Sequence, residues 1–311
     1  METNMTYPEF YDSQNVGSLY TPNISEVISI GHRALLQPSE TDDTKVALLL
    51  IDAQVDFIHE NGALSVAGAV DDTRRTIEWM FRNLGNITKI YASLDSHLPN
   101  QIFSPSWWVD ANGHHPQPFT LITHDEVKSG KWKALYQPKW SLEYTERLEE
   151  NAKKQLMVWP YHTLIGTSGH NITPALYEAI LYHSSARQTQ PEFIIKGTVP
   201  NTEHYSIFEP EVKPDGHADT LINTALLDEL AGYDKIYVAG QAKSHCVLES
   251  VSSMMRYYEK QPETINKIHI LQDAMSSVAS PVIDFDQLAD DTFQQFAKAG
   301  LNLVSTVDSL K

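Results

Sequence analysis

Short apolar segments alternate with longer segments of helical spacing along the chain from about residue 46 onward. The apolar segments have the length and composition of β-strands and cover residues 46–51, 89–94, 156–159, 193–196, 235–240, 267–271 and 301–305. Helical patterns lie near residues 71–84, 173–186, 219–231, 246–259 and 285–298. This alternation is typical of parallel strands joined by helical crossovers. It predicts an α/β fold, a three-layer α/β/α sandwich around a six-stranded, mostly parallel sheet.

Two regions interrupt the alternation. Residues 1–45 are polar and rich in turn formers, with one short helical pattern near residues 24–36, and they predict an N-terminal extension packed on the surface. Residues 99–155 are rich in Pro, Trp, His and charged side chains and predict an insertion over one rim of the sheet. The even spread of apolar segments elsewhere favours a single domain over residues 46–311, with this insertion inside it.

The charge of the chain restricts its partners. Forty acidic residues face 23 basic ones, which gives a formal charge of −17, and no basic run is present. We therefore expect no nucleic-acid partner and no membrane partner. The first residues lack the charged and apolar regions of a signal peptide, and no apolar stretch approaches membrane-spanning length, so we expect a cytoplasmic protein. A homo-oligomer is possible on this sequence.

Polar residues follow the ends of several predicted strands. Ligands of open parallel sheets bind beyond the carboxyl ends of the strands, so these positions are candidates for chemistry. They are Asp52, Asp95, His97, His162, Lys196 and, through the loop after residue 240, Cys246. A thiol, a carboxylate and an amine, with a further carboxylate and two imidazoles, are the parts of a cysteine hydrolase with a metal. A small-molecule amide is the substrate that such a site would take.

Each of these residues also has a structural interpretation. A single cysteine at a helix start is more often a small buried apolar residue than a nucleophile. Asp52 and Asp95 are equally suited to capping the turns that follow them. Lys196 fits an ordinary solvated lysine at a strand end, and the histidines fit loop residues with satisfied hydrogen bonds. The functional interpretation therefore depends on the placement of all six residues at one edge of one sheet.

Five ordered motifs make the sequence resemble the nicotinamidase branch of the isochorismatase-like cysteine hydrolases. The motifs occur over residues 46–306 in the order seen in that family. They are Leu50–Phe57, Asp95–His97, Trp159–His162, Ile195–Thr198 and Val238–Val247. The resemblance implies the isochorismatase-like hydrolase fold, with Asp52, Lys196 and Cys246 as the catalytic residues of an amidase that converts nicotinamide, and also pyrazinamide, to the acid and ammonia.

The proposed chemistry follows from what an amide requires: a strong nucleophile, a proton donor for ammonia and stabilisation of the oxyanion. Cys246 would attack after Asp52 takes the thiol proton, and water would hydrolyse the resulting thioester. We expect the helix N-terminus and the Lys196 ammonium to lower the thiol pKa. Backbone N–H groups of Ala242 and Cys246 would form the oxyanion hole. In the family a cis peptide precedes the first of these, which maps to Gln241-Ala242.

The resemblance also implies a metal and a wall for the substrate. Asp95, His97 and His162 suit a divalent metal, Zn²⁺ first, with Fe²⁺ or Mn²⁺ as alternatives. The family's metal holds the pyridine nitrogen of nicotinamide. Phe57 matches the position of an aromatic residue that packs on the substrate ring. Trp108 is a candidate for the opposite wall, and the alternative is a tryptophan on the surface or in the core of the insertion.

Two departures from the family pattern leave other functions open. Thr163 stands where the family usually has a cysteine, and Ser244-His245 stand where it often has an acidic-aromatic pair. A related cysteine amidase that acts on an N-carbamoyl or other small amide would keep the same catalytic residues. A non-catalytic binding protein on the same fold is the third possibility, and Asp52, Lys196 and Cys246 argue against it.

Overall fold

The computed structural model describes residues 7–151, 154–214, 216, 221–280 and 283–310. Its centre is a six-stranded sheet in which every neighbouring pair of strands is parallel, in the order β10-β9-β8-β1-β2-β7. These strands are β1 (Val46–Ile51), β2 (Lys89–Asp95), β7 (Glu192–Lys196), β8 (Lys235–Gly240), β9 (Ile268–Leu271) and β10 (Asn302–Val304). The predicted α/β class and six-stranded sheet are confirmed, and six of the seven predicted apolar segments form the strands of this sheet.

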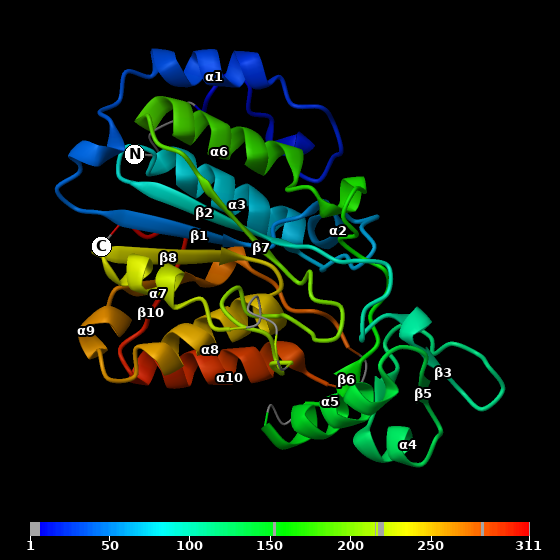
Figure 1. Cartoon of the computed structure of the whole chain (residues 1–311). Helices are drawn as coiled ribbons and strands as arrows, with labels where there is room; N and C mark the ends of the chain where they lie inside the picture. Colours follow the sequence, from blue (N-terminus) through cyan, green and yellow to red (C-terminus); the bar gives the residue numbers. More distant parts are fainter. Residues whose placement is uncertain (1–6, 152–153, 215, 217–220, 281–282, 311) are drawn as a thin grey trace.

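Helices cover both faces of this sheet (Figure 1). On one face lie α3 (Ala69–Arg82) and α6 (Pro174–Arg187), and on the other lie α7 (Thr224–Ala231), α8 (Leu248–Tyr257) and α10 (Phe285–Lys298). All six residues of β1 are buried because alternate side chains enter opposite cores. Leu48 and Leu50 join the core under α3 and α6, whereas Leu49 and Ile51 join the core under α7 and α8.

The chain first adds strands on one side of β1 and later adds strands on the other side. It first runs outward from β1 through β2 to β7, and then returns to β8 on the other side of β1 and continues to β9 and β10. The connections that leave β1 and β8 therefore run toward opposite edges of the sheet, and in folds of this kind ligands bind at such a point, beyond the carboxyl ends of the strands. The short helices α2 (Val55–Ile58) and α9 (Pro262–Ile265) lie in the connections.

One predicted strand does not belong to the central sheet. The prediction placed residues 156–159 at a strand whose end carries His162, but the structure has only a short strand β6 (Leu156–Met157), paired antiparallel with β4 (Leu121–Ile122). The apolar side chains of this segment are buried in the core of the insertion instead of the main sheet. The prediction of its place was wrong because apolar character does not specify which strand is the partner.

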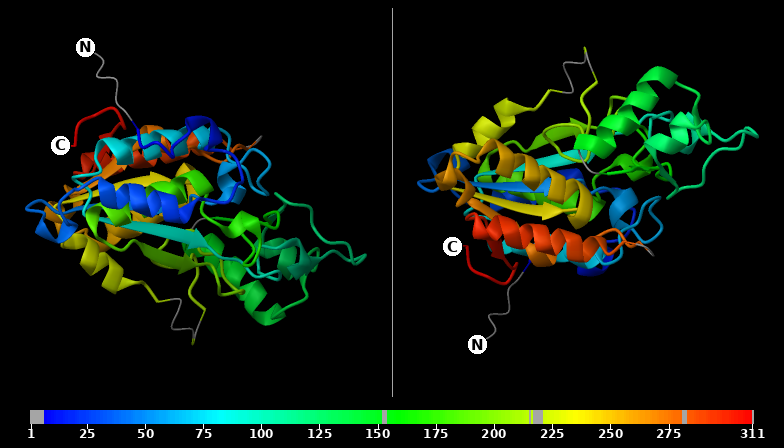
Figure 2. Two further views of the ribbon diagram at one scale, coloured as in Figure 1. Left: turned by 90° about the horizontal axis from the view of Figure 1, so that it is seen from above. Right: turned by 90° about the horizontal axis from the view of Figure 1, so that it is seen from below.

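The insertion forms a small body of its own at the carboxyl edge of the sheet (Figures 1 and 2). Besides β4 it contains β3 (Trp108–Val109), α4 (His124–Lys128), β5 (Lys133–Ala134) and α5 (Pro138–Asn151), and β6 follows directly after it. A separate apolar cluster that includes Trp107, Trp108 and Tyr144 holds these elements together. The insertion therefore adds a wall beside the site instead of extending the sheet.

The N-terminal extension packs on the outer side of α6 through α1 (Ile24–Arg33). Val16 and Val27 in this extension are fully buried, and the Tyr20 hydroxyl donates a hydrogen bond to Glu178 on α6 at 2.6 Å. The described part of the extension, from residue 7 onward, thus packs against α6. Among the described residues, no helix has the length and apolar character needed to cross a membrane.

The contact between α1 and α6 depends on Gly31. A β-carbon at this position would lie 2.6 Å from the Ser185 β-carbon and 3.1 Å from the Tyr182 carbonyl oxygen. We expect Gly31→Ala to lower the free energy of unfolding by about 1–3 kcal/mol through overpacking, despite the better helix propensity of alanine. Denaturant unfolding measures this. Gly85→Ala is the matched control, because a β-carbon there meets no atom within 4 Å; equal stabilities of the two variants would contradict the close packing.

Candidate active site

The carboxyl ends of the central strands bring three predicted catalytic side chains together. Asp52 follows β1, Lys196 is the last residue of β7, and Cys246 lies in a π-helical turn (Lys243–Val247) between β8 and α8. The Lys196 ammonium lies 3.0 Å from Asp52 Oδ2 and donates a hydrogen bond to Cys246 Sγ at 3.6 Å. The thiol in turn donates a hydrogen bond to Asp52. All three side chains are buried, so they contact one another without intervening solvent.

Asp52 is held by the neighbouring strand. Ser93 on β2 donates a hydrogen bond to Asp52 Oδ1 at 2.6 Å, and the Asp52 backbone N–H donates to the Ser93 hydroxyl at 3.0 Å. Burial raises the pKa of this carboxyl, although the positive charge of Lys196 acts in the opposite direction. A carboxylate with a raised pKa is a better proton acceptor than a free aspartate, which suits it to exchange a proton with the thiol.

The Cys246 thiol has a pKa well above its ordinary value. Burial is the main cause; Lys196 lowers the pKa, but Asp52 and Asp95 raise it. Lys196 therefore acts in the predicted direction, but the net pKa of the thiol is raised instead of lowered. The reason is that desolvation and two nearby carboxylates outweigh one ammonium. In the free protein the thiol keeps its proton, and Asp52 must accept that proton as the sulfur attacks.

Lys196 is shared between two carboxylates. Its ammonium lies 2.8 Å from Asp95 Oδ1 and also donates to the His204 carbonyl oxygen at 2.8 Å. Burial alone would lower the lysine pKa, but the negative charges of Asp52 and Asp95 raise it well above the ordinary value. Lys196 is thus a cation that links Asp52 and Cys246 to Asp95.

The backbone before Cys246 has the predicted conformation. The Gln241-Ala242 peptide bond is cis. The Gln241 side chain is fixed at both ends, because its amide nitrogen donates to the buried Asp72 at 2.8 Å and its oxygen accepts from the Ser276 N–H at 3.2 Å. These two hydrogen bonds fix the start of the turn that contains Ala242 and Cys246. Their role as an oxyanion hole stays a prediction.

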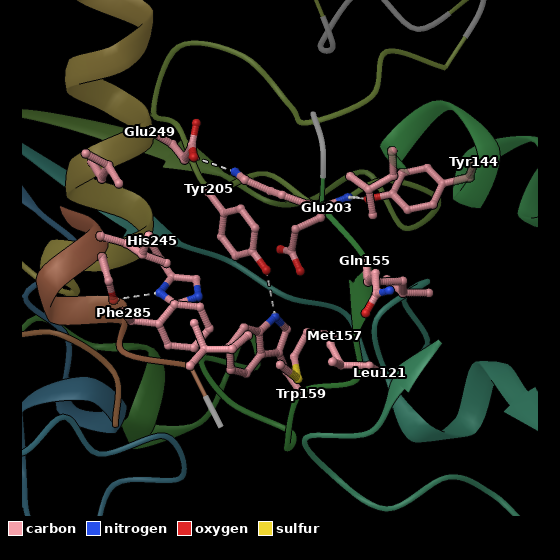
Figure 3. Close-up of a pocket in the computed structure, with 17 residues that line it drawn as sticks. Leu121, Tyr144, Gln155, Met157, Trp159, Glu203, Tyr205, His245, Glu249 and Phe285 are labelled. Carbon is pink, nitrogen blue, oxygen red and sulfur yellow. Dashed lines mark hydrogen bonds and ion pairs between the residues drawn. The ribbon is translucent and has the colours of Figure 1, made fainter. Parts of the chain in front are cut away.

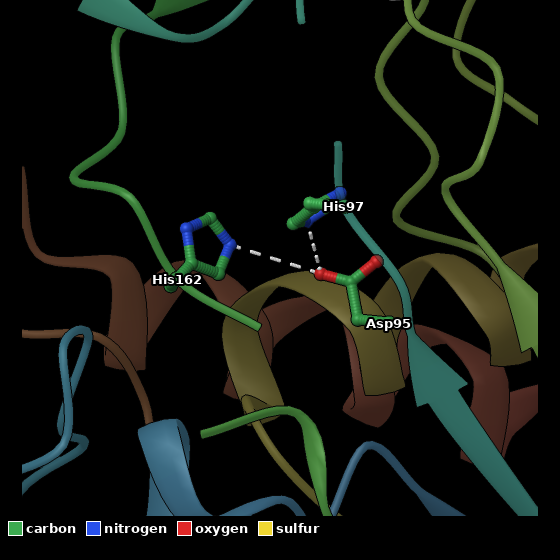
Figure 4. Close-up of side chains that lie close together, drawn as sticks. All are labelled: Asp95, His97 and His162. Carbon is green, nitrogen blue, oxygen red and sulfur yellow. Dashed lines mark ion pairs between the residues drawn. The ribbon is translucent and has the colours of Figure 1, made fainter. Parts of the chain in front are cut away.

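Asp95, His97 and His162 form a buried cluster beside the catalytic residues (Figure 4). One ligand atom from each lies within 4.8 Å of the others. His97 Nε2 is 2.7 Å and His162 Nε2 is 3.7 Å from Asp95 Oδ2. The cluster is the predicted set of one carboxylate and two imidazoles, and it fits a divalent metal such as Zn²⁺ with ligand positions left open.

The surroundings of this cluster support that fit. His162 Nδ1 lies 2.7 Å from the Pro160 carbonyl oxygen, a hydrogen bond that makes Nδ1 the protonated nitrogen and leaves Nε2 free to bind a metal. Burial, followed by the charge of His97, lowers the His162 pKa to about 4, so the ring is neutral. Gly197 gives the cluster its space: a β-carbon there would lie 2.8 Å from Asp95 Oδ1.

The two predicted aromatic walls have different positions. Phe57 in α2 packs edge-on against His162, with 5.5 Å between the ring centroids, so it borders the cluster. Trp108 is fully buried in the core of the insertion, where its indole N–H donates to the Ile102 carbonyl oxygen. Trp108 thus lies in the core of the insertion, and its contact with a substrate stays a prediction.

Three residues near the site were missed in the sequence. Gln54 bonds to both the N–H and the carbonyl oxygen of Asp95, each at 2.8 Å, and so fixes that residue. Ser93 holds Asp52, and a polar residue inside an apolar strand was a visible signal for it. Glu203 is buried beyond β7, where burial raises its pKa to about 7 and His97 partly offsets this. No periodic pattern pointed to Glu203, because it lies in an irregular loop.

A cavity lies next to the nucleophile turn (Figure 3). Its walls include Trp159, Tyr205 and His245, the residue directly before Cys246. The Trp159 indole N–H donates to the Tyr205 hydroxyl at 3.0 Å, and His245 packs edge-on against both rings. Burial lowers the His245 pKa to about 3, so this wall is uncharged.

Comparison with known proteins agrees with this arrangement. The sequence matches no protein-family model and no curated protein. A solved nicotinamidase and pyrazinamidase from Acinetobacter baumanii aligns with 85% of this chain and 97% of its own, at 20% identity and a TM-score of 0.56. The chain has the nicotinamidase fold. The yeast nicotinamidase bound to the inhibitor nicotinaldehyde covers 84% and 99% of the two chains, at 16% identity and a TM-score of 0.57. A nicotinate complex from L. infantum covers 85% and 94%, at 17% identity and a TM-score of 0.51.

These matches confirm the predicted resemblance at the level of the fold. They extend over nearly the whole length of each solved structure, so the chain contains a complete nicotinamidase fold. On that fold, Asp52, Lys196 and Cys246 lie beside the cluster of Asp95, His97 and His162, and the Lys196 ammonium contacts both Asp52 and Asp95.

Proposed function

We propose that this protein is a metal-dependent cysteine amidase that hydrolyses nicotinamide to nicotinate and ammonia. The contact of Lys196 with Asp52, Asp95 and Cys246 at the carboxyl edge of a nicotinamidase fold carries the proposal. Solved structures of this fold include one with nicotinate and one with nicotinaldehyde, both of which contain the pyridine ring of this substrate. Burial of a carboxylate, an ammonium and a thiol costs free energy, and a catalytic role accounts for that cost.

The reaction begins at the thiol. Asp52 accepts the Cys246 proton while sulfur forms a bond to the carboxamide carbon, and the carbonyl electrons move to oxygen. The same proton then passes from Asp52 to the amide nitrogen as the carbon–nitrogen bond breaks, and ammonia leaves. Water next attacks the thioester, with Asp52 accepting its proton, and the carbon–sulfur bond breaks to give nicotinate. The thiol regains a proton at the end, so the enzyme is unchanged.

The remaining groups position and stabilise this chemistry. The backbone N–H groups of Ala242 and Cys246 would donate hydrogen bonds to the oxyanion. Lys196 holds Asp52 ionised and aimed at the thiol. Asp95, His97 and His162 would hold a divalent metal, which supplies a Lewis acid for the ring nitrogen or for the hydrolytic water. Phe57, which packs against His162, would pack on the substrate ring.

A direct assay tests this function. Purified protein supplied with Zn²⁺, Fe²⁺ or Mn²⁺ in turn should release equal amounts of ammonia and nicotinate from nicotinamide. It should also cleave pyrazinamide, which offers the same ring nitrogen and amide. Inactivity on both at millimolar substrate, together with ammonia release from an N-carbamoyl amide, would assign the protein to the related amidases instead. Inactivity on every amide would favour a binding protein.

The metal cluster gives a prediction that does not depend on activity. We expect about one divalent metal per chain in the wild-type protein and loss of that metal in His162→Ala, because His162 supplies one of three ligand side chains. Elemental analysis after dialysis measures the ratio. His114→Ala is the matched control, since His114 lies in the insertion with a side chain that is 79% exposed. Equal metal content in the two variants would contradict the assignment of the cluster.

A further inference from the structure

The cavity beside the nucleophile turn is larger than one pyridine ring needs. Its volume is about 460 Å³, within the ~300–1,000 Å³ typical of pockets that hold drug-sized ligands. Most of its lining side chains are apolar or aromatic. They come from the insertion (Leu121), the loop after β7 (Tyr205), the nucleophile turn and α8 (His245, Leu248), and the start of α10 (Phe285).

This cavity borders the catalytic residues without including them. Asp52, Lys196 and Cys246 do not line it, but His245 does, and its neighbour is the nucleophile. Glu203 also lines it, and the carbonyl oxygen of the next residue, His204, accepts a hydrogen bond from the Lys196 ammonium at 2.8 Å. A molecule whose amide lies at Cys246 would therefore have the cavity within reach of its other end.

Glu203 gives the cavity a polar anchor. The residue is 5% exposed, its Oε1 accepts the His204 N–H at 3.2 Å, and its Oε2 has no hydrogen-bond partner among the described residues. Figure 3 shows the carboxyl group in the space between Tyr205 and Gln155. A carboxyl group offers about four acceptor sites, and the His204 N–H occupies one of them, so a ligand N–H or O–H group could bind at another.

We propose that this cavity binds the distal part of a carboxamide substrate larger than nicotinamide. The ligand class is a heteroaromatic carboxamide with an apolar ring attached and a hydrogen-bond donor that faces the Glu203 carboxyl group. This inference rests on the proposed amidase function and names its substrate class. The insertion, which supplies Leu121 and Leu148, would then set the specificity of the enzyme.

The first test compares substrates. The probes are nicotinamide and pyridine-3-carboxamides that carry a phenyl group, with or without a hydroxyl, on each free ring carbon in turn. At least one substituted amide should have a kcat/KM about 10-fold above that of nicotinamide, mainly through a lower KM. Hydrolysis of nicotinamide with weaker or no hydrolysis of every phenyl amide would overturn the inference and leave the amidase function intact. Inactivity on all probes would overturn both.

The second test locates the effect. Leu288→Trp should fill the cavity from its rim and lower kcat/KM for the best phenyl amide at least 10-fold more than for nicotinamide. Leu288 is 55% exposed, so the larger side chain should not prevent folding. Val307→Trp is the control: Val307 is 85% exposed, does not line the cavity, and its replacement should leave both substrates unaffected. An equal loss for both substrates in Leu288→Trp would contradict binding in the cavity.

The third test concerns the anchor. Glu203→Gln keeps the shape of the side chain and replaces one acceptor oxygen by a donor nitrogen. We expect it to reduce the preference for the hydroxyphenyl amide over the phenyl amide at least 5-fold, with the effect in KM and with metal content unchanged. An unchanged preference would show that the Glu203 carboxyl group does not meet the ligand.

Discussion

Cys246→Ala is expected to lower kcat/KM for nicotinamide by at least ~10³-fold, because the variant has no atom that can form the thioester. Cys246 is 6% exposed, and its side chain forms hydrogen bonds with Asp52 and Lys196. Its replacement by alanine removes one sulfur atom and therefore little packing volume. Measured metal content and unfolding free energy should stay close to those of the wild type. Activity is measured as ammonia release with the metal that supports the wild type best.

A matched variant separates loss of the nucleophile from general damage. Met255→Ala removes a larger side chain from the same α8 region, where Met255 is 9% exposed and lies in the core under α8. It should lower stability more than Cys246→Ala does and reduce kcat/KM far less. Comparable activity of Cys246→Ala and the wild type would show that the thiol is not the nucleophile.

Lys196→Met is expected to have the largest combined effect on stability and activity. The substitution removes the cation that lies between Asp52 and Asp95, both buried, and leaves two carboxylates without their common partner. Breaking a buried ion pair in this way costs about 3–5 kcal/mol. Activity should fall with stability, because Asp52 would become protonated and could no longer accept the thiol proton. Denaturant unfolding and ammonia release measure the two effects.

A double variant distinguishes the electrostatic cause from lost packing. Asp52→Asn in the Lys196→Met background removes one of the two unpaired charges and should recover part of the lost stability. It should recover no activity, since the proton acceptor is gone. If Asp52→Asn lowers the free energy of unfolding as much in the Lys196→Met background as in the wild type, the two side chains do not act as an ion pair.

The main features of the fold could be predicted from the pattern of apolar segments. Strands such as 46–51 and 235–240 are short, apolar and followed by helical patterns, so their parallel pairing follows from general rules. The convergence of Asp52, Lys196 and Cys246 could be predicted for the same reason, because parallel strands end at one edge. The short strand 156–157 was misplaced, since its partner at 121–122 is chosen by long-range packing.

Other properties of the site depend on tertiary burial and had no sequence signal. The high pKa of the Cys246 thiol results from desolvation and from Asp52 and Asp95, which only the folded structure brings near it. The cavity is built from the insertion, the nucleophile turn and α10, regions with no common motif. Glu203 belongs to an irregular loop, where neither periodicity nor spacing indicates which way a side chain points.

Identification of the acylated residue tests the central claim most directly. Wild-type protein turning over nicotinamide is quenched in acid at a series of short times, digested, and analysed by mass spectrometry for a nicotinoyl group. The account predicts this group on the peptide that contains Cys246, released by hydroxylamine as expected for a thioester. A nicotinoyl group on any other residue, while nicotinate accumulates, would contradict it.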